Sequence, residues 1–461
     1  MQRMRNNRIQ HLYFVGIGGA GMSGIAEVLH ENGFKISGSD TGNGPVIQYL
    51  KSLGIQVFPE HNGANIGDAD LLVYSSAIKK DNPEIQEAQN RRVPIIRRAE
   101  MLGELMRLKY TLAIAGTHGK TTTTSLVGSI WEAAGADPTV IVGGIVKGKG
   151  SGAKVGRGNY LVAESDEFDR SFLSMMPSSA IITNIDVDHL DTYANLQEIK
   201  DAFVEFGNKV PFYGQIIVCL DDPNIQSILS RLRKPVVTYG FNRQSKYRIE
   251  NLRVENGGPV FEVLNDGVSL GTFNLKIPGT HNVLNATAAI ALANEENIPV
   301  EIIQKAVASF EGVRRRFELI GETKSGALIY DDYAHHPTEV AATLQGFRET
   351  FPNRRLIVAF QPHLFTRTRD HYESFGSVFS NCDELLVCDI YPAREAPIEG
   401  VTGELVSKSA QERGHRDARF VGAKENVLST LQGELSDKDL VVLMGAGNIT
   451  QLGRELLEGD F

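Results

Sequence analysis

Residues 110–124 decide how the centre of this chain folds, and they read Tyr-Thr-Leu-Ala-Ile-Ala-Gly-Thr-His-Gly-Lys-Thr-Thr-Thr-Thr. The apolar start is typical of a short buried strand. Gly116 and Gly119 then permit a tight turn whose backbone N–H groups close on an anion, while Lys120 adds a positive charge and Thr121 a hydroxyl suited to Mg²⁺. The stretch therefore predicts a strand, a phosphate-binding loop and a helix whose N-terminus faces the phosphate.

This loop is a shortened form of the common phosphate-binding loop. Ile114 stands where the full motif has its first glycine, which leaves Gly-x-x-Gly-Lys-Thr. The alternative is an ordinary strand-to-helix turn with a surface lysine. We favour the phosphate loop because glycine, lysine and threonine all stand where phosphate binding needs them.

Length and composition indicate a large globular protein. The chain has 461 residues, enough for roughly three domains, and 42% of them are apolar. Its net charge of −9 argues against a nucleic-acid partner. Cys219, Cys382 and Cys388 lack the spacing of a metal site or a disulfide framework. No apolar run is long enough to span a membrane, so we expect a cytoplasmic protein without membrane insertion. We also expect a monomer or a weak homodimer.

A second glycine-rich loop lies near the N-terminus. Residues 16–21 read Gly-Ile-Gly-Gly-Ala-Gly, follow a predicted strand at 11–15 and precede a predicted helix at 22–32. Asp40 ends the next strand, where a dinucleotide-binding unit places an acid. The pattern favours a diphosphate site, although a tight turn without ligand is the alternative. Residues 1 to about 108 read as one doubly wound α/β domain.

Two further strand ends in the central region carry chemically useful side chains. Glu164 follows the predicted strand 160–163, and His189 follows the predicted strand 180–183. Because the carboxyl ends of parallel strands meet at one sheet edge, both are expected near Lys120 and Thr121. Each has an ordinary alternative, since acidic runs are often solvated and a histidine often lies in a core. Together they predict a site for one or two Mg²⁺ ions on a nucleotide.

The remainder predicts a hairpin region and a third α/β part. Residues 247–277 lose the α/β rhythm and carry two hairpin signals, so we expect a small antiparallel β insertion. Arg314, Arg315 and Arg316 form a positive cluster that is either a solvated linker or an anion clamp. The predicted fold is α/β with three domains: a Rossmann-like domain at 1–108, a P-loop ATPase-like domain at 109–321 and a second Rossmann-like domain at 322–461.

Taken together, these motifs resemble the Mur ligases over nearly the whole chain. The resemblance implies that the first glycine loop holds the diphosphate of a UDP-sugar and not of NAD. The residues implied there are Gly16, Gly18, Gly19, Ala20, Gly21, Met22, Ser23 and Asp40. Those implied for ATP are Gly116, Thr117, His118, Gly119, Lys120, Thr121, Thr122, Asn285, Arg316, Asp331 and His335. His363, Arg367 and Arg369 are implied for the amino acid and sugar acid, Thr121, Glu164 and His189 for metal, and Lys120, Glu164 and His189 for catalysis.

The resemblance also implies a reaction. ATP and Mg²⁺ would convert the carboxylate of UDP-N-acetylmuramate into an acyl phosphate, which the amine of L-alanine then attacks. Three alternatives stay open: a sister ligase that attaches a tripeptide to the same sugar, an NAD-dependent oxidoreductase, and a non-catalytic P-loop regulator. Leu364 departs from members that have a basic residue there. The base for the amine, and the choice among L-alanine, L-serine and glycine, are left open.

Overall fold

The computed structural model of the chain describes residues 9–75, 78–143, 153–168, 170–188, 192–255, 257–393 and 395–459. His189, one of the predicted metal ligands, lies outside these residues. The chain divides into two compact units, Met1–Asn251 with Phe261–Phe273 and Leu284–Phe310, and Leu252–Val260 with Asn274–Val283 and Glu311–Phe461. Three sheets run through them in chain order, which confirms the predicted succession of α/β parts.

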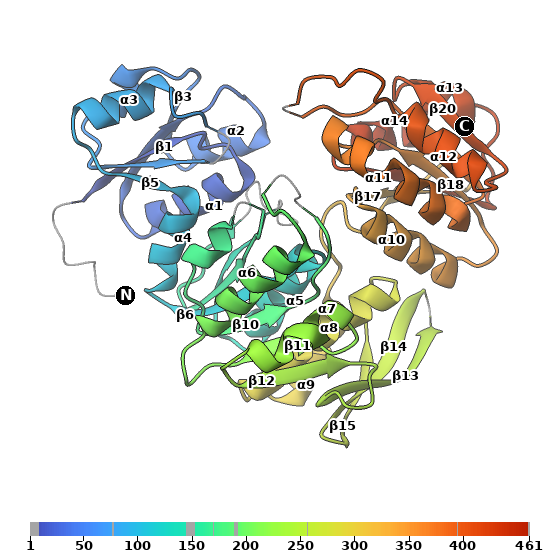
Figure 1. Cartoon of the computed structure of the whole chain (residues 1–461), viewed down its shortest axis with the longest axis horizontal. Coiled ribbons are helices and arrows are strands. Elements are labelled where there is room, and N and C mark those ends of the chain that lie inside the picture. The colour runs from blue at the N-terminus through green and yellow to red at the C-terminus, as the bar shows by residue number, and fades with distance from the viewer. Residues whose placement is uncertain are drawn as a thin grey trace. The chain divides into compact units, whose positions relative to one another are not determined.

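The first sheet has five parallel strands in the order β3-β2-β1-β4-β5. Its strands are β1 (His11–Val15), β2 (Lys35–Ser39), β3 (Gln56–Phe58), β4 (Leu71–Tyr74) and β5 (Ile95–Arg97), and its helices are α1 (Ala20–Glu31), α2 (Pro45–Ser52), α3 (Pro83–Asn90) and α4 (Arg98–Met106). The strand order reverses at β1, whose end leads into the first glycine loop, and such a switch point is where open α/β sheets bind ligands. Residues 91–98, which include four arginines, hold β5 and the start of α4 (Figure 1).

The second sheet has ten strands in the order β15-β14-β13-β12-β11-β10-β6-β9-β7-β8. Its strands up to the hairpins are β6 (Tyr110–Ala115), β7 (Thr139–Ile141), β8 (Ala153–Lys154), β9 (Tyr160–Glu164), β10 (Ser179–Ile182), β11 (Ile216–Cys219) and β12 (Val236–Gly240). The buried strand β6 lies between β9 and β10, parallel to both. The ends of these three strands therefore meet at one edge, where α5 (Lys120–Ala133) begins.

The predicted antiparallel insertion is a continuation of this second sheet. Strands β13 (Tyr247–Glu255), β14 (Gly258–Asn265) and β15 (Val268–Asn274) extend it beyond β12. Asp266 and Gly267 join β14 to β15 with φ of 46° and 83°, the backbone of a tight hairpin turn. The helices of this part are α6 (Leu196–Asn208), α7 (Pro223–Ile228), α8 (Thr280–Glu295) and α9 (Val300–Ser309).

The third sheet has six strands in the order β16-β17-β21-β18-β19-β20, with only β16 antiparallel to its neighbour. These are β16 (Glu318–Glu322), β17 (Leu328–Asp332), β18 (Arg355–Phe360), β19 (Glu384–Cys388), β20 (Ala418–Gly422) and β21 (Asp439–Met444). The helices are α10 (Pro337–Thr350), α11 (Phe365–Val378), α12 (Glu404–Glu412), α13 (Asn426–Leu431) and α14 (Leu452–Glu458).

Helices cover both faces of this third sheet. Alternate residues of β18 enter different cores, with Leu356, Val358 and Phe360 in one and Ile357 and Ala359 in the other. That division follows from the two-residue period of a strand. Within the part of the chain that the structure describes, the helices are each too short or too polar to cross a membrane.

Candidate active site

The phosphate loop connects the buried end of β6 to the first turn of α5. Gly116 has φ of +134°, and a Cβ there would lie 2.0 Å from Oγ1 of Thr183. Gly119 has φ of +81°, and a Cβ there would lie 2.5 Å from Oδ1 of Asn285. Both positions require glycine, because another residue would combine an unfavourable backbone with a collision. Asn285, one of the predicted ATP residues, thus lies directly against the loop.

The residues that follow β10 hold this loop in shape. The backbone N–H of His118 donates to Oδ1 of Asn184 at 2.8 Å, and Nδ2 of Asn184 donates back to the His118 carbonyl at 3.0 Å. The backbone N–H of Asp186 donates to Oγ1 of Thr117 at 2.9 Å, and the Asp186 carboxylate lies 3.2 Å from Nε2 of His118. Asn184 was not among the predicted site residues, although its place after a buried strand is the signal that identified Glu164.

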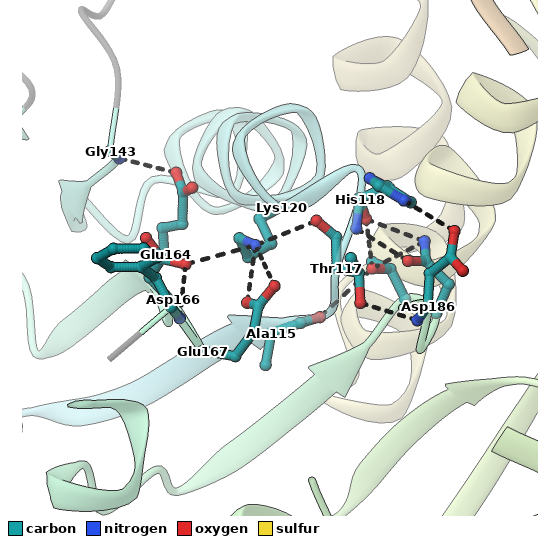
Figure 2. Close-up of polar contacts among 12 residues, drawn as sticks. Ala115, Thr117, His118, Lys120, Gly143, Glu164, Asp166, Glu167 and Asp186 are labelled. Carbon is teal, nitrogen blue, oxygen red and sulfur yellow. Dashed lines mark hydrogen bonds and ion pairs between the residues drawn. The ribbon is translucent and has the colours of Figure 1, made fainter. Parts of the chain in front are cut away.

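Lys120 is held by the carboxylate of Glu167, which was not among the predicted site residues. Its Nζ donates to Glu167 at 2.8 and 3.1 Å and to the carbonyl of Thr117 at 3.2 Å (Figure 2). The Asp166 carboxylate lies farther away, at 3.7 Å. Burial alone would lower the pKa of Lys120, but the negative charges of Glu167 and Asp166 outweigh it and hold that pKa above its ordinary value. Lys120 therefore carries a positive charge at neutral pH.

Two of the three predicted metal ligands lie together. The hydroxyl of Thr121 lies 3.1 and 3.2 Å from the two carboxylate oxygens of Glu164, and the backbone N–H of Gly143 donates to the same carboxylate at 2.8 Å. Burial raises the pKa of Glu164 despite the opposing effects of Gly143 and Lys120, so a cation at this point would favour the charged carboxylate. Hydroxyl and carboxylate oxygens are the ligands that Mg²⁺ prefers, and these residues fit such an ion. Thr122 faces away into the buried side of α5.

The first glycine loop is held by Asp40. Oδ2 of Asp40 accepts the backbone N–H of Gly18 and Oδ1 accepts that of Gly42, both at 2.8 Å. A Cβ at Gly18 would lie 2.8 Å from the same carboxylate. Asp40 therefore supports the loop backbone, while Gly16 provides the left-handed turn with φ of +76°.

The helix that follows this loop begins with the remaining predicted UDP-sugar residues. Gly19 is the N-cap of α1, and Ala20 is its first residue. The side chains of Met22 and Ser23 are buried in the core. Against Gly21 lies a guanidinium that we did not predict, because a Cβ there would be 2.7 Å from Nη1 of Arg98. Arg98 thus adds a positive charge beside the start of the helix.

In the second compact unit, Arg315 binds Asp331 of β17 and the chain just after β21. Nε of Arg315 donates to Oδ2 of Asp331 at 3.1 Å, and its Nη2 donates to the carbonyl of Gly445 at 2.6 Å. Thr450 donates to the same Asp331 oxygen at 2.6 Å. Arg316 lies 3.5 Å from Glu339, whose carboxylate also accepts the backbone N–H of His335 at 3.1 Å.

Two of the three residues predicted for the amino acid and sugar acid lie together. Nη1 of Arg367 lies 3.5 Å from Nδ1 of His363, and the His363 ring stacks on Tyr391 with centroids 5.9 Å apart. The His335 ring lies edge-on to His363 at 5.8 Å. Arg369 instead pairs with the adjacent Asp370 and is half exposed. Leu364, the departure noted in the sequence, precedes α11 with a left-handed φ of +70°.

Comparisons with known proteins cover all three sheets. Family models match in succession: "Mur ligase family, catalytic domain" at residues 11–110, "Mur ligase middle domain" at 114–293 and "Mur ligase, glutamate ligase domain" at 315–447. The UDP-N-acetylmuramate–L-alanine ligase of Geobacter sp. (strain M21) is 48% identical over 450 residues, covering 98% of this chain and 97% of that protein.

Solved structures give the same result. The UDP-N-acetylmuramate-alanine ligase of Thermotoga maritima superimposes with a TM-score of 0.83 at 30% identity, over 97% of this chain and 98% of that one. A murein peptide ligase from Psychrobacter arcticus has the same fold, with a TM-score of 0.71 at 24% identity over 97% of this chain and 98% of that one.

Proposed function

The chain belongs to the Mur ligase family, and from this premise we propose that it joins L-alanine to the carboxylate of UDP-N-acetylmuramate, with ATP converted to ADP and phosphate. The observation that carries this proposal is the 48% identity to a ligase of that name along 98% of the chain. The reaction belongs to the synthesis of peptidoglycan precursors. We further propose that the protein is cytoplasmic and is a monomer or a weak homodimer. The proposed domain boundaries follow residues 108 and 321.

ATP binds at the phosphate loop in this account. The loop of residues 116–119 and the start of α5 receive the triphosphate, because the dipole of the helix favours an anion at its N-terminus. Lys120 and Thr121 contact it, and Asn285 lies against the loop at Gly119. We also assign Arg316, Asp331 and His335 to nucleotide binding.

Thr121 and Glu164, together with His189, would hold Mg²⁺. The short distance between the Thr121 hydroxyl and the Glu164 carboxylate supports this assignment. When bound, the ion supplies positive charge that offsets the negative charge of the transferring phosphoryl group.

The chemistry has two steps. A carboxylate oxygen of the sugar forms a bond to the γ-phosphorus of ATP as the bond to ADP breaks, which yields an acyl phosphate. The neutral amine of L-alanine then bonds to the acyl carbon, phosphate leaves with the electron pair of the C–O bond, and the nitrogen loses a proton. Lys120 stabilises the charge that develops on the phosphoryl oxygens in the first step.

The other two groups of residues bind the substrates that are joined. Gly16, Gly18, Gly19, Ala20, Gly21, Met22, Ser23 and Asp40 form the UDP-sugar site, in which the loop and helix N-terminus receive the diphosphate. Arg98 adds a charge there. His363, Arg367 and Arg369 receive the carboxylates of the sugar acid and the amino acid.

The sister ligase that attaches a tripeptide is the second candidate, because a murein peptide ligase shares the fold. The experiment that separates the two supplies the protein with ATP, Mg²⁺, UDP-N-acetylmuramate and one amine at a time, and identifies the product by mass. We expect the L-alanyl product, with less from glycine and L-serine. A product formed only with L-alanyl-γ-D-glutamyl-meso-diaminopimelate would replace the proposal with the second candidate.

A further inference from the structure

We propose that Glu167 is a positioning residue of the phosphate site: its carboxylate holds the Lys120 ammonium in place at the loop and yields it to phosphate oxygens when a nucleotide binds. The inference rests on the proposed function only in that Lys120 contacts the phosphates of ATP. Glu167 is a buried acid that takes no part in the two chemical steps of the proposed reaction.

The contacts of Lys120 provide the first argument. An ammonium group has three N–H donors, and three acceptors surround this one: two Glu167 oxygens at 2.8 and 3.1 Å and the Thr117 carbonyl at 3.2 Å (Figure 2). A phosphate oxygen can therefore bind Lys120 only by replacing one of them. The Thr117 carbonyl belongs to the loop backbone, so a Glu167 oxygen is the acceptor that gives way.

The surroundings of Glu167 provide the second argument. Its side chain is 2% exposed, and its backbone carbonyl accepts both the Tyr193 hydroxyl at 2.8 Å and the Arg170 N–H at 3.0 Å. The Arg170 guanidinium lies 4.8 Å from the centre of the Tyr193 ring. A carboxylate on such a fixed segment holds a partner in a defined place, whereas Asp166 is 46% exposed and 3.7 Å from Lys120.

The local charge provides the third argument. One ammonium faces the three carboxylates of Glu164, Asp166 and Glu167, and each ionised carboxylate weakens the attraction of this site for an anion. Of the three, Glu167 has the shortest contact with Lys120. Its charge therefore opposes metal-free nucleotide most strongly, while its hydrogen bonds keep the ammonium where phosphoryl transfer needs it.

Glu167→Gln tests both consequences, because it removes the charge and keeps the shape. With EDTA present, we expect the variant to bind ADP at least ~10-fold more tightly than wild type by calorimetry, since an opposing charge is gone. We expect kcat with Mg²⁺ to fall at least ~10-fold, since the ammonium is no longer held. The matched control is Asp166→Asn, for which both changes should stay below about 3-fold because that carboxylate is exposed and more distant.

A Glu167→Gln protein that melts like wild type but binds metal-free ADP equally or less tightly would overturn the inference. If that variant does not fold, the double variant Lys120→Met/Glu167→Gln takes its place. It should melt at a higher temperature than Lys120→Met, in which the buried Glu167 carboxylate has lost its ammonium partner. No such gain would also overturn the inference. Wild type that binds ADP but ligates no amine would contradict the proposed function and leave this inference intact.

Discussion

Oγ1 of Thr121 lies 3.1 Å from Oε2 of Glu164, which links the first turn of α5 to the end of β9. The two residues are 43 positions apart in the chain, and parallel pairing of β6 with β9 brings them to one edge. This contact is the part of the proposed metal site that the described residues contain.

Thr121→Val should weaken the use of Mg²⁺, because valine has nearly the shape of threonine without the hydroxyl. We expect the Mg²⁺ concentration for half-maximal phosphate release to rise roughly 10-fold or more. Thr121→Ser is the control and should remain within about 3-fold of wild type, since it keeps the hydroxyl oxygen. Equal magnesium curves for the valine and serine variants would argue against Thr121 as a ligand.

Gly119→Ala should remove nucleotide binding. The new methyl group would lie 2.5 Å from Oδ1 of Asn285, on a backbone with φ of +81°. Gly135→Ala is a matched control, since Gly135 has φ of +75° with nothing within 4 Å of its added Cβ. Both variants should lose about 1 kcal/mol of stability to backbone strain, and only Gly119→Ala should also lose ADP binding in calorimetry. Equal ADP affinities in the two variants would contradict the close approach of Asn285.

Arg315→Lys should destabilise the second compact unit by about 1–3 kcal/mol, since lysine cannot reach two acceptors with a planar fork. The wild-type guanidinium binds Asp331 and the carbonyl of Gly445. Arg314→Lys is the control, because Arg314 is 61% exposed and lies 3.9 Å from Glu318. Urea unfolding followed by hydrogen exchange in β17 and β21 measures both, and equal stabilities would refute the role of Arg315.

The stability of the fold should depend on pH through the buried carboxyl group of Asp332. Burial raises its pKa from 3.8 to about 6, against the opposing effects of Arg316 and the N–H groups of Phe317 and Ala334. The folded state therefore binds the proton more tightly than the unfolded state. Protonated Asp332 therefore makes its full contribution to the free energy of unfolding below about pH 4. This contribution, on the order of 3 kcal/mol, is lost as the pH rises through about 6.

Asp332→Asn removes this titration, so its stability should change less than that of wild type between pH 4.5 and 7.5. Chemical unfolding at several pH values measures the difference between the two proteins. Parallel pH profiles for wild type and variant would show that Asp332 does not titrate in this range.

Local chain chemistry was sufficient to predict the phosphate loop and the α/β succession. Glycine, lysine and threonine at fixed spacing define a strand–loop–helix unit, and apolar runs of strand length recur along the chain. The hairpin strands were expected as a separate insertion, because pairing of β12 with β13 is a contact between segments that the sequence pattern does not encode. Strand β5 and helix α4 were not predicted, because the four arginines of residues 91–98 obscure the apolar pattern of a strand and a helix.

Within the candidate site, the sequence alone could not tell which of several neighbouring residues of the same type makes a given contact. Glu164 and Glu167 stand in one acidic run, and only the fold shows that Glu167 holds Lys120 while Glu164 meets Thr121. Arg315 and Arg316 are neighbours, yet Arg315 binds Asp331 and the Gly445 carbonyl whereas Arg316 lies beside Glu339. The roles assigned to the remaining site residues, His189 included, stay predictions.

The central claim is an amide ligation driven by ATP, and phosphate release tests it most directly. The assay contains ATP, Mg²⁺, UDP-N-acetylmuramate and L-alanine, omits each in turn, and compares wild type with Lys120→Ala. We predict release that requires both the UDP-sugar and L-alanine and falls at least ~100-fold in the variant, because the charge that stabilises phosphoryl transfer is lost. Release that persists without the sugar or the amine, or no release with any amine, would contradict the account.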